Sequence, residues 1–546
     1  MNLSSDIKFK FDVEEHRLTI ANEYPMLSGF FGDGIADVTG VIGRNGSGKS
    51  NAIEILCKLL KESKTAISSD FLIVEKTDND YTCHFSFGQR SAPNVPSGLL
   101  ARRYSGEFED LKVVFFSNVY DGRKNNFGSE ISDISLSAQQ ILRFPGERSS
   151  EFLKQYRLVQ SQIFEKINID LPAMIRLRNR LWQYMENARL DRDSLEVIRF
   201  LKRMMRSRIK ELAPHKKLLP LLRLGIFLDI YASVPAAEIQ SIGGRSLAMH
   251  VLDHLHHAKE ISLTTDEITR SLLETLERLL PIEYNDPNGP PSPKRTRLSP
   301  RRRGYNFHRL LSFARELDNL LDNMSYDYVV EGARTRETEY FTFDYSSPIF
   351  KRFAVEFIES LDSSPYFDMD WIGLSSGHKA YLNLFSSLYE ELKRTRHRNI
   401  FLCIDEGDLY LHPKWQVEFL SRLISTLPYM CSGSVQLVLT SHSPFLVSDL
   451  PNQSLIILDR QRLSTETDGT NLEVRTFGGN LYDLYSSPFF LEEKRMSDFA
   501  FSRIKDWVIE VENSMDSVSR KKINQFVDLI GDEVIRFRLK KALKND

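Results

Sequence analysis

Cysteine is scarce in this chain of 546 residues. The four cysteines, Cys57, Cys83, Cys403 and Cys431, are widely spaced and lie mostly inside apolar stretches. This spacing matches neither a disulfide framework nor a zinc site, so we expect four reduced side chains, most of them in the core. Such cysteine usage is typical of a cytoplasmic protein.

Long apolar runs and an excess of one charge are absent as well. No segment is apolar enough over sufficient length to cross a bilayer, and residues 1–10 lack a secretory core, so we expect a cytoplasmic protein with no membrane partner. The 72 basic and 74 acidic residues give a net charge of −2. Any nucleic-acid surface must therefore come from a local patch. The length predicts two to four domains.

A glycine-rich segment stands out near the start of the sequence. Residues 43–50 read GRNGSGKS and fit the P-loop pattern G-x-x-x-x-G-K-[ST]. A buried strand is predicted over 37–42 and a helix from about Lys49, so turn amides and a helix N-terminus would face the phosphates of ATP. Lys49 is expected to reach the β- and γ-phosphates, and the Ser50 hydroxyl to bind Mg²⁺. The predicted nucleotide-binding residues here are Gly43, Arg44, Asn45, Gly46, Ser47, Gly48, Lys49 and Ser50.

Three apolar stretches end in polar residues, as strands beside a nucleotide do. NIFLCIDE (399–406) ends in Asp405, a predicted Mg²⁺ ligand, and Glu406, a predicted catalytic base. QLVLTSHS (436–443) brings His442 to a strand end, where it is predicted to lie near the γ-phosphate. A buried strand over 111–118 ends in Ser-Asn and is placed near the nucleotide. The alternative is a set of core strands with surface polar ends, but the P-loop disfavours it.

A further loop, GLSSGHKA (373–380), precedes a helix predicted over 381–392. Its Ser375, Ser376 and Gly377 would expose N–H and O–H donors to an anion at the helix N-terminus. Ordinary helix capping is the alternative. Gln89 is a weaker candidate for a magnesium-contacting glutamine, and a surface loop residue is the simpler reading.

The middle of the chain changes character. Apolar residues recur at helical spacing from about 138 to 280, which predicts a helical insertion. His250, His254 and His257 share one helix face, but no second pair of ligands accompanies them, so we expect a surface helix and not a metal site. Basic residues dominate part of this region, which favours either a solvated face or a surface for phosphate backbones or an acidic partner. They are Arg176, Arg178, Arg180, Arg199, Lys202, Arg203, Arg206, Arg208, Lys210, Lys216 and Lys217.

Residues 287–303 read PNGPPSPKRTRLSPRRR and leave little to bury. We expect an extended, basic, proline-rich loop there, which is either a plain linker or a contact for nucleic acid or an acidic partner.

The order of the motifs resembles one branch of the ABC-type ATPases. P-loop, long interruption, signature loop, acidic strand end (Walker B) and switch histidine follow each other as in the SMC/RecF/OLD branch. The strings FFSNVYD (115–121), DEGDLYLHPKWQ (405–416), TSHSPFLVSDLP (440–451) and TFGGNLYDLYSSPFFL (476–491) resemble the PtuA-like ATPases of Septu and retron-associated anti-phage defence.

This resemblance implies an α/β fold, an ABC-type P-loop ATPase head that is split in two. Residues 1–140 and 346–490 would form the head, 141–345 a mainly α-helical insertion carrying the loop 287–303, and 491–546 a helical tail. Heads of this class bind ATP and Mg²⁺ between protomers, so Ser375–Gly377 would face the nucleotide held by Lys49 of a second copy in a homodimer or higher oligomer.

The resemblance also implies partners. PtuA-like ATPases act with an HNH nuclease (PtuB-like), and in retrons with a reverse transcriptase and multicopy single-stranded DNA. Ser376 and His378 depart from the usual L-S-G-G-Q signature, which predicts slow ATP hydrolysis. No acidic cluster for a Toprim nuclease follows His442, so no intrinsic nuclease is expected.

Other readings stay open. The main alternative is a RecF/SMC-like DNA repair ATPase without a dedicated nuclease partner. A self-contained OLD-like nuclease and a transporter subunit fit less well, and a scaffold without ATPase activity is disfavoured because Lys49, Asp405, Glu406 and His442 are all present.

Overall fold

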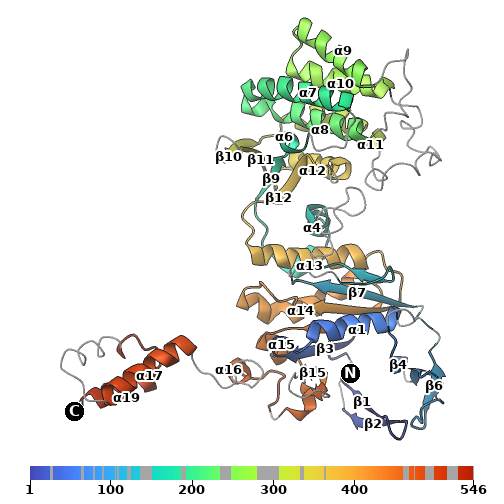
Figure 1. Ribbon diagram of the computed structural model, residues 1–546, viewed down its shortest axis with the longest axis vertical. Helices are drawn as coiled ribbons and strands as arrows, with labels where there is room; N and C mark the ends of the chain where they lie inside the picture. The colour runs from blue at the N-terminus through green and yellow to red at the C-terminus, as the bar shows by residue number, and fades with distance from the viewer. Residues whose placement is uncertain are drawn as a thin grey trace. The chain divides into compact units, whose positions relative to one another are not determined.

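The computed structural model describes most of the chain (Figure 1). The described residues are 1–24, 29–62, 67–77, 80–88, 91–104, 106, 108, 110–119, 125–135, 151–185, 192–233, 247–279, 307–332, 337–361, 364–458, 466–472, 474–485, 497–512 and 527–544. Gln89 and the basic loop 287–303 lie outside them. The contacts divide the chain into a smaller unit, residues 1, 40–49 and 442–546, and a larger unit, residues 2–39 and 50–441.

Parallel strands form the centre of the larger unit. β3 (Ile35–Gly43) begins there, and the sheet continues through β14 (Ser434–Thr440), β13 (Asn399–Asp405), β7 (Leu111–Ser117) and β8 (Ile131–Asp133). β7 and β13 are almost wholly buried, as their continuous apolar sequence predicts for a sheet covered on both faces. The parallel register sets Asp405 level with Thr440 on one side and Ser117 on the other. Three polar strand ends therefore meet at one edge.

Several helices accompany this sheet. α1 (Lys49–Lys61) starts at the P-loop, α13 (Ser376–Leu392) precedes β13, and α14 (Pro413–Met430) joins β13 to β14. All three begin within a few residues of a predicted functional motif. The predicted strand–P-loop–helix order and the strand ending at Asp405 are confirmed, and so is an α/β fold.

The smaller unit is built on the second half of β3. β15 (Leu455–Leu458) pairs with it in parallel, and β16 (Glu466–Asp468) pairs with β15 in the antiparallel sense. α15 (Pro444–Asp449) and α16 (Leu481–Tyr485) pack together, and so do α17 (Asp498–Glu512) and α19 (Glu533–Lys544). The helices predicted for the C-terminal tail are therefore present as α17 and α19.

Helices also dominate the middle of the chain (Figure 1). α8 (Leu218–Ser233) is apolar and buried on almost all sides, and α10 (Thr265–Leu279) and α11 (Phe307–Leu321) pack against it. α7 (Arg192–Glu211) contacts α9 (Leu247–Glu260) and α10. α12 (Pro348–Leu361) packs on α11, and α6 is Leu181–Tyr184. α4 (Glu151–Val159) packs on α13, and α5 (Phe164–Ile167) packs on α14. α7 confirms a helix within the stretch 138–280, where apolar residues recur at helical spacing.

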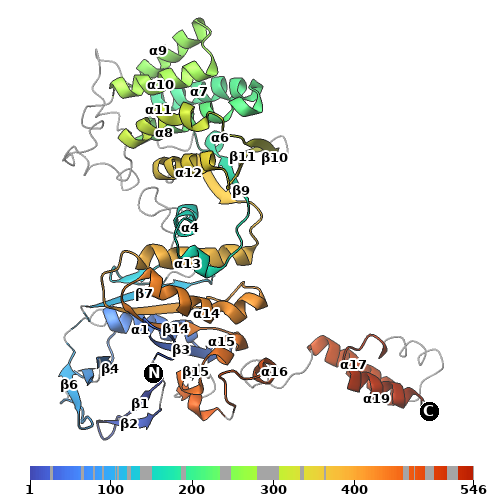
Figure 2. The same ribbon diagram turned by 180° about the vertical axis from the view of Figure 1, so that it is seen from behind.

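One stretch of this region was predicted wrongly as helix. Met174–Asn179 forms β9, the third strand of an antiparallel sheet with the order β10–β11–β9–β12. Figure 2 shows β9, β10 and β11 from behind. Buried Ile175 and Leu177 alternate there with partly buried Arg176 and Arg178, which is the period of a strand. The other strands of this sheet are β10 (Asp327–Glu331), β11 (Thr338–Asp344) and β12 (Phe367–Trp371).

Two small sheets complete the larger unit. β1 (Ile7–Asp12) and β2 (Arg17–Glu23) form an antiparallel hairpin near the N-terminus. β4 (Phe71–Thr77), β5 (Asp80–Ser86) and β6 (Leu99–Arg103) form the other sheet. Over the described residues, no helix has the length and apolar character needed to span a membrane.

Candidate nucleotide-binding site

The P-loop closes tightly around its lysine in the smaller unit. The Lys49 ammonium is 5% exposed and donates hydrogen bonds to the carbonyls of Gly43 (3.0 Å) and Arg44 (3.3 Å). A side chain at Gly43 would meet the Leu458 carbonyl oxygen, because a Cβ built there lies 2.3 Å from it. The loop can therefore take this curled form only with glycine at its first position.

The same loop contains a buried polar atom that a phosphate would satisfy. The Ser47 hydroxyl is buried and has no hydrogen-bond partner among the described residues. Gly46 and Gly48 have φ of +75° and +91°, which turn the backbone amides around the loop. A buried cation, a glycine-rich turn and an unsatisfied donor fit the phosphates of a nucleotide.

His442 belongs to the same unit as Lys49. It follows β14 by two residues, is exposed, and its Nδ1 lies 3.5 Å from the Lys49 Nζ. The sequence predicted both residues beside one phosphate, and the structure brings their side chains together.

Asp405 forms the centre of a second cluster, in the larger unit. Its carboxylate is 3% exposed and accepts hydrogen bonds from the hydroxyls of Thr440 (2.6 Å), Ser50 (3.1 Å) and Ser117 (3.4 Å). Burial raises the pKa of Asp405, the hydroxyls of Thr440 and Ser50 oppose that shift, and the charge of Glu406 adds to it.

No basic side chain among the described residues pairs with Asp405, so its charge is balanced only by neutral donors. A buried carboxylate beside a serine hydroxyl is the oxygen-rich ligand set that Mg²⁺ prefers. The residues at this strand edge therefore fit the metal that the sequence predicted for Ser50 and Asp405.

Glu406 has an unusual backbone conformation. Its φ is +48°, in the left-handed region that costs a non-glycine residue about 1–3 kcal/mol. The Glu406 amide donates to the Thr440 carbonyl (3.2 Å) and to the Thr440 Oγ1 (3.0 Å), which holds this conformation. Thr440 thus donates its hydroxyl proton to the predicted metal ligand Asp405 and accepts the amide proton of the predicted base Glu406.

Side chains at the ends of the neighbouring strands hold the loop after Glu406. The Asn118 side-chain amide donates to the Leu409 carbonyl (2.9 Å), and the Ser441 hydroxyl donates to the Asp408 carboxylate (2.5 Å). Asn118 is 1% exposed, which agrees with the prediction that β7 ends beside the site.

The predicted signature residues lie at the start of α13. Ser375 caps this helix, since its Oγ accepts from the His378 amide (3.2 Å), and it also lies 2.8 Å from the His378 Nδ1. The His378 ring packs edge-on against Trp415, with centroids 4.2 Å apart. Gly377 contacts the loop after Glu406, because a Cβ there would lie 2.8 Å from the Tyr410 carbonyl oxygen.

Thr440 was missed by sequence reasoning, although its signal was visible. It ends a buried strand just before Ser441 and His442, and a parallel register sets it level with Asp405. Of the α9 histidines, His254 contacts the Ser271 hydroxyl at 2.8 Å, and burial lowers its pKa.

Comparison with known proteins agrees with this site. Residues 278–448 match the AAA_21 family, described as "AAA domain, putative AbiEii toxin, Type IV TA system". The matched range contains Asp405, Glu406 and His442. The match supports a nucleotide-binding ATPase domain of the AAA type in this chain.

Individual relatives are similar over shorter segments. The chain is 28% identical over 18% of its length to a Vibrio cholerae protein named "Retron Vc95 probable ATPase". It is 25% and 29% identical, over 28% and 21% of its length, to proteins named "Septu protein PtuA" from Bacillus thuringiensis and Bacillus mycoides. The aligned segments span only 21%, 38% and 16% of these relatives' own lengths. The predicted resemblance to PtuA-like ATPases is thereby confirmed.

Proposed function

We propose that this chain is an ABC-type subunit that binds ATP with Mg²⁺ and hydrolyses it slowly. The observation that carries the proposal is the hydrogen bond between Ser50, the last residue of the P-loop motif, and Asp405. Lys49 directly precedes Ser50 in that motif, and the P-loop pattern assigns both residues to one nucleotide.

Each residue then has a role that its surroundings support. Lys49 exchanges its carbonyl partners for phosphate oxygens, and the Ser47 hydroxyl gains a partner. Ser50 and Asp405 would hold the Mg²⁺, which would supply positive charge to stabilise the phosphate oxygens. Glu406, held by Thr440, orients a water and accepts its proton, and His442 contacts the γ-phosphate.

The proposed active form is a head dimer or a higher oligomer. Ser375, Ser376 and Gly377 of one protomer would complete the site that contains Lys49 of the other. The Ser375 hydroxyl is engaged with His378, so a nucleotide must compete for it. This competition supports slow hydrolysis, which suits a switch with a long-lived bound state. The proposed layout is a head of residues 1–140 and 346–490, an insertion of 141–345 and a tail of 491–546.

The names of the relatives suggest the biological setting. We propose that the chain is the cytoplasmic ATPase of a bacterial anti-phage defence complex. It would gate a PtuB-like HNH nuclease and have no nuclease activity of its own. A reverse transcriptase and retron single-stranded DNA would be further partners. The Septu and retron names of similar chains support this role.

Nucleotide binding by the full chain tests the site. Lys49→Ala is expected to weaken Mg·ATP binding by at least about 30-fold, since a charge-assisted hydrogen bond is worth about 1.5–3 kcal/mol and Lys49 makes more than one. Lys58→Ala is the matched control on α1, where Lys58 pairs with Glu54 at 2.8 Å. Equal affinities of the two variants would contradict the assignment.

Purification of the tagged protein from its host tests the setting. An HNH protein together with a small structured single-stranded DNA would support the retron arrangement, and an HNH protein alone would support a Septu pair. Recovery of the ATPase alone, with ATP-dependent binding to ordinary DNA, would favour the repair class of ATPases instead.

A further inference from the structure

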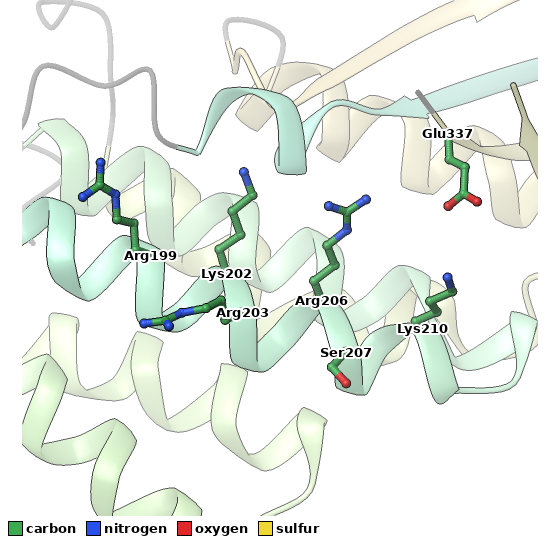
Figure 3. Close-up of a pocket in the computed structure, with 7 residues that line it drawn as sticks. All are labelled: Arg199, Lys202, Arg203, Arg206, Ser207, Lys210 and Glu337. Carbon is green, nitrogen blue, oxygen red and sulfur yellow. The ribbon is translucent and has the colours of Figure 1, made fainter. Parts of the chain in front are cut away.

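One face of α7 carries a row of basic residues that the ATPase chemistry does not use. Five of them line a pocket of about 930 Å³ together with Ser207 and Glu337 (Figure 3). The basic members are Arg199, Lys202, Arg203, Arg206 and Lys210. Their spacing of three and four residues places them on one side of the helix, opposite the buried Val197, Leu201 and Met205.

The row is long and regular. From residue 199 to residue 210, eleven steps of about 1.5 Å give about 16 Å along the helix axis. Each strand of a nucleic-acid duplex carries one phosphate per about 3.4 Å of its axis, so this row can face about five phosphates. Arg203, Arg206 and Lys210 are exposed, and none of them forms an ion pair with an acid of the described chain.

The structure shows that several residues of the predicted basic patch do not belong to the α7 row. Arg176 and Arg180 were grouped with these residues on sequence, but they lie at or beside β9 and pair with Asp370 and Asp368. Arg208 points elsewhere and donates to the Leu263 carbonyl. Arg178 lies over the Tyr340 ring, and Lys217 donates to the Lys210 carbonyl. Five members of the predicted patch therefore line the α7 pocket.

We propose that this α7 pocket binds the phosphate backbone of a nucleic acid. Its lining has no apolar residue, whereas interfaces with protein segments are anchored by apolar or aromatic side chains. Three of the five basic residues are arginines. Each planar guanidinium group can donate two parallel hydrogen bonds to the oxygens of one phosphate. Recognition of this kind depends on salt and not on sequence. The proposal does not depend on the proposed ATPase activity.

A substitution of Glu337 tests the proposal by an expected increase in nucleic-acid affinity. Glu337 is the one acid that lines the pocket, and it lies at the Lys210 end (Figure 3). Its carboxylate repels a phosphate backbone, so Glu337→Gln is expected to strengthen nucleic-acid binding about twofold.

The main test uses the full chain and fluorescently labelled strands of 30 nucleotides, as single-stranded DNA, duplex DNA and RNA. The triple variant Arg203→Glu, Arg206→Glu, Lys210→Glu is expected to lose at least about tenfold in affinity and about two to three units of slope in log K against log salt. The control Lys10→Glu, Arg102→Glu, Lys259→Glu changes the net charge equally on exposed sites outside the pocket. The strand type that binds best identifies the natural class of ligand.

Folding of both triple variants is checked by circular dichroism and thermal unfolding. If the triple variant does not fold, lysine acetylation of the wild-type protein gives a second test. Bound nucleic acid should slow the acetylation of Lys202 and Lys210 more than that of Lys10. Equal losses in the two triple variants, no protection of these lysines, or binding of wild type to polyglutamate and not to nucleic acid would each overturn the proposal.

Discussion

Asp449 shows how one buried charge is expected to affect stability. It ends α15, and burial raises its pKa to about 6 from an ordinary value of 3.8. A carboxylate at a helix C-terminus also faces the negative end of the helix dipole. The ionised form is therefore the unfavourable one in the folded state. Above pH 6 its charge lowers stability, and that loss is recovered as the pH falls from about 7 towards 4.

Asp449→Asn should remove this pH dependence. We expect the variant to be more stable than wild type by about 1 kcal/mol at pH 8, after allowance for partial exposure, and nearly equal to it at pH 4. Thermal unfolding midpoints at both pH values, shifted by roughly 1–2 °C at pH 8, would measure this. Asp483→Asn, an exposed aspartate on α16, is the control. An equal gain at both pH values would show that the charge is not the cause.

The positions of polar residues at strand ends could be predicted because the pattern that marks them is local. The P-loop spacing, Asp405 and Ser117 follow from a buried strand that stops at polar residues. Thr440 was missed because its importance depends on register: it lies level with Asp405 only through the pairing of β13 with β14. A single sequence does not contain that pairing.

At the scale of elements, helix α13 and the loop that follows β13 are joined. Ser375 is bound to His378, the His378 ring packs on Trp415 of α14, and Gly377 lies against the Tyr410 carbonyl. Tyr410 itself has a φ of +71°, so the loop is held in a conformation that it would not adopt alone. A change at His378 should therefore alter the availability of the Ser375 hydroxyl more than the fold.

His378→Gln should raise the rate of ATP hydrolysis. Loss of the Ser375–imidazole hydrogen bond is worth about 1 kcal/mol, which corresponds to about a fivefold increase in kcat if the freed hydroxyl contacts the transferred phosphate. Steady-state phosphate release would measure this, with His397→Gln, a partly exposed histidine just beyond α13, as the control. A rate unchanged or lowered in His378→Gln would show that this hydrogen bond does not limit hydrolysis.

Element types were predictable where one period dominated. α7 followed from apolar residues at a spacing of three and four, and β7 and β13 from continuous apolar runs. β9 was mistaken for helix because its short alternation, Ile175 and Leu177 between arginines, lies inside a long basic helical region. Its pairing with β11 and β12, both more than 150 residues later, decides the structure, and such distant pairing is not visible in local periodicity.

At the scale of the whole molecule, the proposed cycle depends on two copies of the chain. If Glu406 is the base, Glu406→Gln should bind Mg·ATP without hydrolysing it, because the amide does not accept a proton from water. The signature residues of a second copy would then stay on the nucleotide. We expect hydrolysis to fall by at least about 100-fold and a stable dimer to form only with ATP.

Sedimentation of Glu406→Gln with ATP, with ADP and without nucleotide measures this dimer. Glu260→Gln, an exposed residue of α9, is the matched control and should remain as wild type. Adding Ser376→Arg places a bulky charge on an exposed signature residue, so the double variant should bind ATP and sediment as a monomer. If the double variant dimerised as well as the single one, the heads would meet through another surface, and Ser375–Gly377 would be a helix cap without a role across protomers. Wild-type hydrolysis by Glu406→Gln would instead remove Glu406 from the mechanism.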